Sequence, residues 1–322
     1  MTTTETPDVL VLAELNPDVV LRGVSAVRFG QAEQLVEQAA LALGSSGAIT
    51  ASALVAQGRP TALCAVVGDD LAGEAALRML AGQGVDTDAV AVRPDVATGM
   101  TVVLSGNDGD RALLTFPGAM AALTVDQVPR ALLAAVRHVH VSSFYLQQGL
   151  HAGLVELLDA ARADGVTTSV DPGWDPAEKW QSIAGVLGHV DHLLPNATEC
   201  LAIAGAMGHV TDDPLAAATT IAAHGPAVTV KMDTRGAAHV GPAGRWRVAA
   251  APVDVVDSTG AGDNFDAGFL AGLLAGESPD RALARGAACG AVAVTGLGGV
   301  GALASPEHAE LLANQLTTEE IA

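Results

Sequence analysis

Residues 257–269 read Asp-Ser-Thr-Gly-Ala-Gly-Asp-Asn-Phe-Asp-Ala-Gly-Phe, and this stretch decides the fold. It predicts a strand end, a glycine turn and the start of a buried helix. Residues 248–256 ahead of it are rich in Val and Ala, and Phe265, Phe269 and Leu273 recur at every fourth position. The first amides of a helix have no partner within the helix and carry a partial positive charge. The turn is therefore predicted to bind an anion.

Asp263 stands beside this predicted anion site. A single acidic residue in a first helical turn is common, because it gains about 0.3–1 kcal/mol from the helix dipole. Here it follows Gly260 and Gly262, which have no Cβ and so let a ligand approach the backbone closely. Phosphoryl transfer needs both parts, amides that hold the moving phosphate and a base that takes the proton of the acceptor hydroxyl.

Composition restricts the possible partners. The chain has 322 residues, enough for one large α/β domain or two smaller ones, and 16 Lys and Arg against 36 Asp and Glu give a net charge of −20. Such an acidic chain is not expected to bind nucleic acid or an anionic membrane. Cys64, Cys200 and Cys289 are far apart, and the first residues lack the basic start of a signal peptide. These features predict free thiols and a cytoplasmic protein.

The uncharged stretch 286–304 is too rich in Gly and Ala for a membrane span, and a buried helix followed by a glycine-rich loop is expected there. Within that loop, 296–301 spells G-x-G-x-x-G. Too little chain follows for a dinucleotide-binding unit, so a nicotinamide-dependent oxidoreductase is disfavoured. His138 and His140 alternate along a strand without a third zinc ligand in view, and no G-x-x-x-x-G-K-[ST] string is present. The last residues, 317–322, are expected to be frayed.

Strands and helices alternate along most of the chain. Polar residues follow several of the predicted strands, and in open α/β sheets ligands bind at the carboxyl ends of the strands. The pattern predicts a doubly wound, mainly parallel sheet flanked by helices. The predicted strands are 9–15, 61–67, 136–141, 166–170, 192–194 and 228–232, and the predicted helices are 48–57, 150–163, 199–205 and 214–224.

Two segments, about 19–43 and 97–118, do not follow this alternation of strands and helices. The second contains two apolar runs around the turn 106–109, which predicts a β-hairpin. In the first, residues 34–43 look helical by propensity.

The string Asp-x-Thr-Gly-Ala-Gly-Asp-x-Phe-x-Ala-Gly resembles the signature of the ribokinase-like (PfkB) carbohydrate kinase family. The resemblance extends over about residues 9–304. Asn16-Pro17-Asp18 looks like the family's Asn-x-Asp motif, although alone it reads as a turn. Residues 44–51 resemble the first family signature, residues 68–73 a Val-Gly-x-Asp-x-x-Gly segment, and residues 196–199 the Asn-x-x-Glu motif.

The resemblance implies an ATP-dependent kinase that phosphorylates a primary hydroxyl of a sugar or sugar-like molecule. It implies a single ribokinase-like domain over 1–322, with 19–43 and 97–118 as a small β-sheet lid that pairs in many relatives to form homodimers. Asp263 would be the general base, and the amides of Gly260, Ala261 and Gly262 the anion hole. The acceptor-side residues would be Asn16, Asp18, Gly44, Ser45 and Ile49, and the ATP-side residues Asn196, Glu199, Lys231, Asp233 and Gly236.

Two metal roles are also implied by the resemblance. Glu199 would help to organise hydrated Mg²⁺, and Asp257 with the loop 294–301 would hold a monovalent cation such as K⁺.

Three positions depart from the family pattern. Ile49 stands where Asn is usual and removes one sugar contact, and Ser45 replaces a second Gly. Asp233 stands where Gly is usual and would repel a triphosphate unless Lys231 offsets its charge. The acceptor is left open among neutral sugars, inositols, sugar acids and nucleosides; a phosphorylated sugar is disfavoured because bases are few. A nucleoside kinase of the same family and a non-catalytic sugar-binding or regulatory protein are the alternatives.

Overall fold

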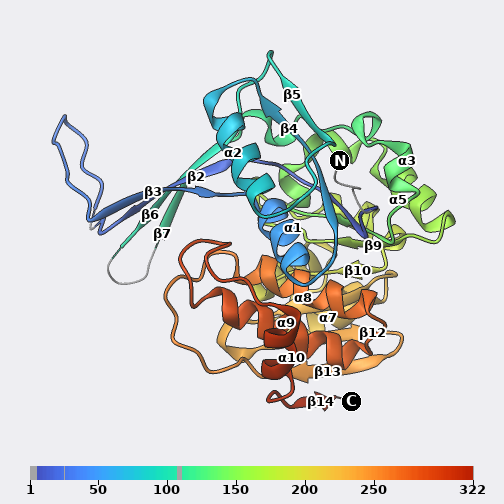
Figure 1. Ribbon diagram of the computed structural model, residues 1–322. Coiled ribbons are helices and arrows are strands. Elements are labelled where there is room, and N and C mark those ends of the chain that lie inside the picture. Colours follow the sequence, from blue (N-terminus) through green and yellow to red (C-terminus); the bar gives the residue numbers. More distant parts are fainter. Residues whose placement is uncertain (1–5, 25, 107–110, 322) are drawn as a thin grey trace.

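The computed structural model describes residues 6–24, 26–106 and 111–321, so the predicted turn at 106–109 falls largely outside them. Two sheets and a set of helices make up the described chain (Figure 1). The strands are β1 (Val9–Leu12), β2 (Pro17–Arg22), β3 (Gln38–Leu43), β4 (Thr61–Gly68), β5 (Val90–Arg93), β6 (Met100–Ser105), β7 (Arg111–Phe116), β8 (His138–Val141), β9 (Thr167–Val170), β10 (His192–Leu193), β11 (Ala227–Lys231), β12 (Ala237–Gly241), β13 (Gly244–Val248) and β14 (Thr318–Glu320). The α-helices are α1 (Ser46–Ala56), α2 (Leu71–Gly82), α3 (Arg130–Leu133), α4 (Gln148–His151), α5 (Leu154–Ala163), α6 (Ala197–Ala206), α7 (Pro214–Ala222), α8 (Ala261–Leu274), α9 (Pro279–Ala293) and α10 (Pro306–Ala313).

The large sheet has ten strands in the order β14-β13-β12-β11-β10-β9-β8-β1-β4-β5. All neighbours from β11 to β5 are parallel, whereas β12, β13 and β14 add an antiparallel edge. The predicted mainly parallel α/β fold is confirmed, and the alternating strand and helix segments identified all of its parallel strands except β5. The parallel register brings the carboxyl ends of β1, β8, β9, β10 and β11 to one edge of the sheet.

Two apolar layers cover the two faces of this sheet. On one face, α1, α2, α8, α9 and α10 pack against side chains such as Val11 and Val67. On the other face, α3, α5, α6 and α7 pack against side chains such as Val141 and Val230. Ala, Val and Leu fill most of both layers, as the low aromatic content requires.

The second sheet has four strands in the order β3-β2-β6-β7 and projects from the body of the molecule as a lid (Figure 1). β6 and β7 pair antiparallel from Met100↔Phe116 to Ser105↔Arg111, so the predicted hairpin is confirmed in its strands. The segment that looked helical by propensity is a strand over Gln38–Leu43, where it pairs with β2. Pairing within the sheet has overridden local propensity.

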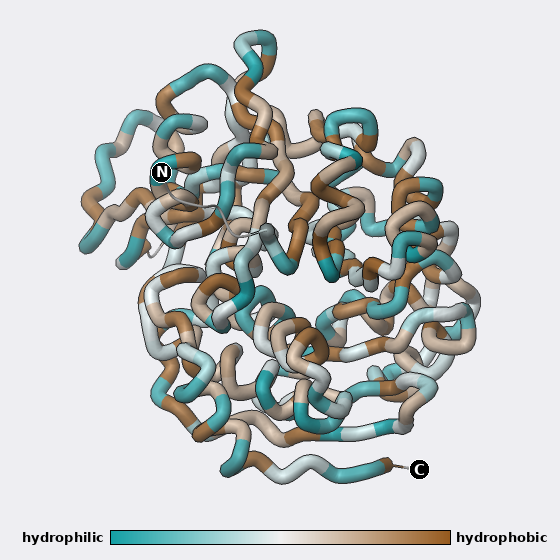
Figure 2. The backbone as a smooth tube through the Cα atoms, turned by 45° about the vertical axis from the view of Figure 1, so that its right-hand side comes forward, coloured by the Kyte–Doolittle hydropathy of each residue, from teal (hydrophilic) through white to brown (hydrophobic). Residues whose placement is uncertain are grey.

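Two predictions about local structure are wrong. Residues 248–256 were expected to lead into the glycine turn as a strand, but β13 ends at Val248 and the residues after it form an irregular loop; Pro252 cannot donate to a ladder, and Val255 is 66% exposed. Residues 318–320, within the range expected to be frayed, instead form β14, which pairs with β13 and closes the antiparallel edge of the sheet. This last strand runs along the outer edge of the molecule (Figures 1 and 2).

The stretch 286–304 divides as expected into the end of α9 and a glycine-rich loop. Of the helices in the described chain, none combines the length and apolar character needed to cross a bilayer.

Candidate active site

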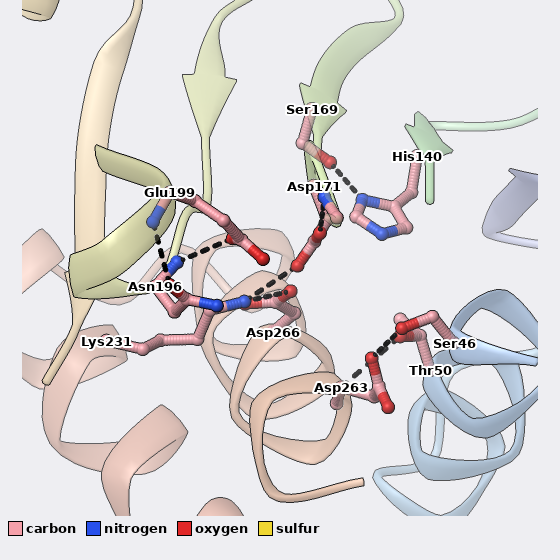
Figure 3. Close-up of polar contacts among 11 residues, drawn as sticks. Ser46, Thr50, His140, Ser169, Asp171, Asn196, Glu199, Lys231, Asp263 and Asp266 are labelled. Atoms are coloured by element: carbon pink, nitrogen blue, oxygen red, sulfur yellow. Dashed lines mark hydrogen bonds and ion pairs between the residues drawn. The ribbon is translucent and has the colours of Figure 1, made fainter. Parts of the chain in front are cut away.

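The carboxyl edge of the large sheet gathers polar side chains from distant parts of the chain. Asn16 follows β1, Ser143 follows β8, Asp171 follows β9 and Asn196 follows β10, while Lys231 is the last residue of β11. Helix α8 begins beside this edge, opposite the start of α1 (Figure 3). The predicted location of the site at the strand ends therefore agrees with the arrangement of these residues.

The turn at the start of α8 depends on glycine. Gly260 caps the helix at φ 74°, and a Cβ placed there would lie 2.6 Å from Gly299 Cα, so only glycine fits. Asn264 Nδ2 donates to the carbonyl oxygens of Gly260 (2.8 Å) and Gly299 (2.9 Å), which fixes the turn against the glycine-rich loop. The amides of Gly260, Ala261 and Gly262 are thus collected in one rigid turn at the positive end of a 14-residue helix.

Asp263 lies in the first turn of α8 and faces the start of α1 (Figure 3). Ser46 Oγ donates a hydrogen bond to Asp263 Oδ1, and Thr50 Oγ1 lies 3.5 Å from the Asp263 carbonyl oxygen. Oδ2 has no hydrogen-bond partner among the residues that the structure describes. Burial raises the pKa of Asp263 to about 7, and the charges of Asp171 and Glu14 act in the same direction. A carboxyl group in this state can accept a proton near neutral pH.

Asn16, Asp18 and Gly44 form one contact group at the base of the lid. Asn16 Nδ2 donates to Asp18 Oδ1 at 3.0 Å, and a Cβ at Gly44 would lie 2.1 Å from that same oxygen. Gly44 is therefore required for Asp18 to stand where it does. Burial, followed by the charge of Glu14, raises the pKa of Asp18 to about 7.

Glu14 lies beneath this group and is 3% exposed. Its Oε1 accepts from Ser46 N and Ser143 Oγ, both at 3.2 Å, and its Oε2 accepts from Gln147 Nε2 at 2.8 Å. Ser45 Oγ donates to the Glu14 carbonyl oxygen. An unbroken chain of contacts therefore runs from Gln147 through Glu14 to Ser46 and Asp263.

Ser45 and Ile49, which depart from the family pattern near α1, both have structural consequences. Ser45 adopts φ 69°, which explains why glycine is usual there, and its Oγ accepts from Ala48 N to cap α1. Ile49 is 4% exposed and packs against the anion-hole turn: its Cγ2 would be 3.1 Å from a Cβ at Gly260, and its Cδ1 2.3 Å from one at Gly299. Ile49 thus supports the turn by apolar contact at a position where a hydrogen-bonding side chain is usual.

Asn196 and Glu199 cap α6 reciprocally. The Asn196 side chain accepts from Glu199 N and the Glu199 carboxylate accepts from Asn196 N, each at 2.9 Å. Burial, followed by the charge of Asp171, raises the pKa of Glu199 to about 7. The described residues contain no group of three or more His, Cys, Asp or Glu side chains that could hold a metal. A single carboxylate of this kind suits Mg²⁺ that is bound mainly by phosphate oxygens and water.

Lys231 does not offset Asp233, contrary to the expectation from the sequence. Its Nζ donates to Asp171 Oδ2 at 2.7 Å and to Asp266 Oδ1 and Oδ2 at 3.0 and 2.8 Å (Figure 3). Asp233 is exposed and adopts φ 51°, the conformation that favours glycine, so its carboxylate is solvated. Gly236 is required by its surroundings, because a Cβ there would lie 1.9 Å from the Val248 carbonyl oxygen.

Asp257 ties the signature turn to the loop 294–301. Its Oδ1 accepts from Thr259 N (3.0 Å) and Thr259 Oγ1 (2.7 Å), and its Oδ2 accepts from Gly298 N (3.0 Å). Burial opposes ionisation, but these hydrogen bonds and the charge of Arg111 hold the pKa of Asp257 below its ordinary value. Three of its roughly four lone-pair positions are therefore occupied by protein donors.

The lid reaches this turn through two arginines. Arg111, at the start of β7, donates to Thr259 Oγ1 at 2.9 Å, and Arg22, at the end of β2, lies 3.5 Å from the Val256 carbonyl oxygen. The lid therefore meets the loop that precedes the anion-hole amides.

No role in the site was predicted from the sequence for Glu14, Ser46, Asp171 or Asp266. Asp171 follows a predicted strand and was recognisable as a polar strand end. Asp266 lies three residues after Asp263 within the quoted signature. No pattern in the sequence indicates the pairing of Ser46 with Asp263, which are 217 residues apart.

The similarity to known proteins extends over nearly the whole chain. The family model for pfkB family carbohydrate kinases matches residues 7–305. The chain is 30% identical over 288 residues to an ATP-dependent ribose-1-phosphate kinase of Halopiger xanaduensis, covering 88% of this chain and 90% of that protein. It is 27% identical over 258 residues to a ribokinase of Haemophilus influenzae, covering 79% and 82%.

Among solved structures, a putative ribokinase II from E. coli in complex with ATP and Mg²⁺ is similar to this fold. The TM-score is 0.82 at 25% identity, and the match covers 96% of this chain and 99% of the other. The unliganded form of that protein matches with a TM-score of 0.84 over the same shares of the two chains.

Proposed function

This chain belongs to the pfkB family of carbohydrate kinases, and we propose that it transfers the γ-phosphate of ATP to a sugar hydroxyl with Asp263 as the general base. ATP-dependent phosphorylation of a sugar is the activity of its family. The observation that carries the proposed mechanism is the position of Asp263. One carboxylate oxygen is held by Ser46, the other has no partner in the described chain, and Asp263 itself lies in the first turn of α8.

In the proposed reaction, Asp263 Oδ2 takes the proton of the acceptor hydroxyl as the hydroxyl oxygen attacks the γ-phosphorus. The bond between the γ-phosphorus and its bridging oxygen breaks, and ADP leaves. The amides of Gly260, Ala261 and Gly262 stabilise the negative charge on the phosphoryl oxygens during this step. Losing one preorganised donor of this kind typically costs about 10²–10³-fold in rate.

Asn16, Asp18, Gly44, Ser45 and Ile49 are the residues proposed for the acceptor side. Asn16 and Asp18 would contact sugar hydroxyls directly. Gly44, Ser45 and Ile49 would act through the shape of the turn, since Gly44 makes room for Asp18, Ser45 caps α1 and Ile49 packs against Gly260.

Asn196, Glu199, Lys231, Asp233 and Gly236 are the residues proposed for the nucleotide side. ATP with Mg²⁺ is the phosphate donor, and bound magnesium neutralises part of the phosphate charge. Glu199 would orient this ion through water, because the described residues contain no group of three or more His, Cys, Asp or Glu side chains that could hold it directly. A monovalent cation, with K⁺ as the candidate, would be held by the loop 294–301 together with the lone-pair position that protein donors leave open on Asp257.

We further propose that two chains associate through their lids in the cytoplasm. Leu113 and Leu114 of β7 and Leu41 of β3 are 54–60% exposed, which is unusual for three large apolar side chains of one small sheet. A cytoplasmic location agrees with the use of ATP and with three free, buried cysteines in the described chain.

Asp263→Asn tests the base assignment. The amide has the same shape but cannot take the proton, so kcat should fall by about 10²–10⁴-fold while the Kd for ATP is retained. The measurement is ADP release by a coupled assay over a panel of sugars, with and without K⁺. A variant with near-normal kcat would refute the role of Asp263.

A further inference from the structure

Lys231 is a buried lysine whose ammonium group is held by two carboxylates (Figure 3). Its Nζ donates to Asp171 Oδ2 at 2.7 Å and to Asp266 Oδ1 and Oδ2 at 3.0 and 2.8 Å. The side chains of Lys231, Asp171 and Asp266 are 12%, 10% and 1% exposed. An ammonium group has three N–H donors, so these three contacts match its donor capacity. The Lys231 side chain is therefore committed to the two carboxylates.

The three residues of this cluster come from three different elements. Lys231 ends β11, Asp171 follows β9, and Asp266 lies on α8. Asp266 is three residues after Asp263, so it belongs to the next turn of the same helix. Asp171 is fixed in addition by Gly173 N, which donates to its Oδ1 at 2.7 Å. The ion pairs therefore tie the first two turns of α8 to the carboxyl ends of β9 and β11.

The Lys231 side chain also lies against the anion-hole turn. Apart from α8 itself, the nearest atoms to a Cβ placed at Gly262 are Nζ, Cδ and Cε of Lys231, at 3.7–3.8 Å. Gly262 supplies one of the three amides that are proposed to stabilise the phosphoryl group, and Asp263 is the next residue. A displacement of the Lys231 side chain would therefore change the position of both.

The charges within the cluster are balanced. Burial opposes the ionisation of Asp171, but Lys231 and the hydrogen bonds to Asp171 hold its pKa below the ordinary value. Burial raises the pKa of Asp266 well above its ordinary value, although the charge of Lys231 acts in the opposite direction. Near neutral pH the cluster therefore consists of a cation, an anion and a neutral carboxyl group, which reduces the cost of burying it.

We propose that Lys231 is a positioning residue that, held by Asp171 and Asp266, fixes the anion-hole amides and the base against the sheet without touching the nucleotide. This inference rests on the proposed function and gives the nucleotide-side assignment of Lys231 a specific form. Lys231 acts through the turn that holds the γ-phosphate, because carboxylates already occupy its donors. A displacement of about 1 Å in a reacting group can cost about 10²-fold in rate, even when the altered residue lies outside the chemistry.

Lys231→Met tests this role by separating turnover from nucleotide binding. With the sugar of the panel that gives the fastest ADP release, we expect kcat to fall about 10–100-fold, while the Kd for ATP with Mg²⁺, measured by calorimetry, stays within about threefold of the wild-type value. A Kd raised more than about tenfold overturns the inference, because a lysine that binds the nucleotide would weaken ATP binding directly. Lys179→Met changes the only other lysine, which is exposed, and should alter neither quantity.

Two variants of Asp266 test the same contact from the helix. Asp266→Asn keeps the shape of the side chain, an oxygen for Lys231 and a donor for Asp171, so kcat should stay within about threefold of the wild-type value. Asp266→Ala removes the contact and should lower kcat about 10–100-fold with the Kd for ATP unchanged. Equal kcat in the two variants would contradict the inference. Melting curves show whether each variant is folded, and if Lys231→Met is not, the Asp266 pair decides by the same criteria.

The outcome also distinguishes this inference from the proposed function. If turnover is lost in Asp263→Asn but Lys231→Met mainly raises the Kd for ATP, the kinase mechanism is retained and the positioning role is removed. If none of the acceptors gives ADP with the wild-type protein, both the proposed function and the inference are contradicted.

Discussion

The hydrogen bond from Ser46 to Asp263 makes a quantitative prediction about the pH dependence of the reaction. Ser46→Ala removes a donor to the charged form of Asp263, and this donor lowers a pKa that burial has raised to about 7. Hydrogen bonds to charged groups contribute about 1.5–3 kcal/mol, and one pKa unit corresponds to about 1.4 kcal/mol. At the lower end of this range, the pKa of Asp263 should rise by about one unit, to about 8.

The direction of the pH effect follows from the role of Asp263 as the base. Asp263 must be ionised to accept a proton, so activity is lost as pH falls through its pKa, and a higher pKa moves this loss to higher pH. At pH 7 the ionised fraction should decrease from about one half to about one tenth, which gives about a fivefold fall in kcat/KM. At pH 9 both proteins should be almost fully ionised and nearly equal.

The assay is the profile of kcat/KM against pH between 5.5 and 9 with a saturating amount of the second substrate. Thr50→Val is the matched control, since Thr50 Oγ1 approaches the backbone oxygen of Asp263 and not its carboxylate. An acid limb that stays in place in Ser46→Ala, or the same loss of activity at every pH, would refute the reasoning.

Two other predictions concern magnesium and assembly. Glu199→Gln should raise the Mg²⁺ concentration needed for half-maximal activity, because a neutral amide orients a hydrated cation less strongly; an unchanged magnesium titration would remove that role. Sedimentation velocity should give twice the mass of the chain, and Leu113→Asp with Leu114→Asp should give the single-chain mass with folding retained, because both side chains are already more than half exposed. A wild-type protein that sediments as a single chain contradicts association through the lid.

The parallel sheet and the location of the site were predictable from the sequence because both depend on local patterns. The parallel strands that were predicted, all except β5, are apolar runs followed by polar residues, and the parallel register brings Asp171, Asn196 and Lys231 to one edge. The helix after Gly260 was predictable for the same reason, since its apolar repeat and its glycines lie within one short segment.

The features that could not be predicted from the sequence depend on contacts between distant segments. Residues 34–43 favour a helix locally, and pairing with β2 makes a strand of Gln38–Leu43. β14 likewise forms only because β13 offers an open edge. The ion pairs of Lys231 with Asp171 and Asp266 join three elements, so the sequence could suggest a partner for Lys231 but not identify it.

The two halves of the site come from opposite ends of the chain. Segments before residue 60 bring Asn16, Asp18 and the start of α1, whereas segments after residue 190 bring Glu199 and the start of α8. Ser46 and Thr50 are the residues through which α1 touches Asp263 in the described chain. On the proposed assignment, mutations in the first sixty residues that leave Ser46, Ile49 and Thr50 in place can diversify the substrate range without disturbing the phosphorylating apparatus. Chimaeras that exchange this N-terminal portion between paralogues would be a practical route to engineered specificity.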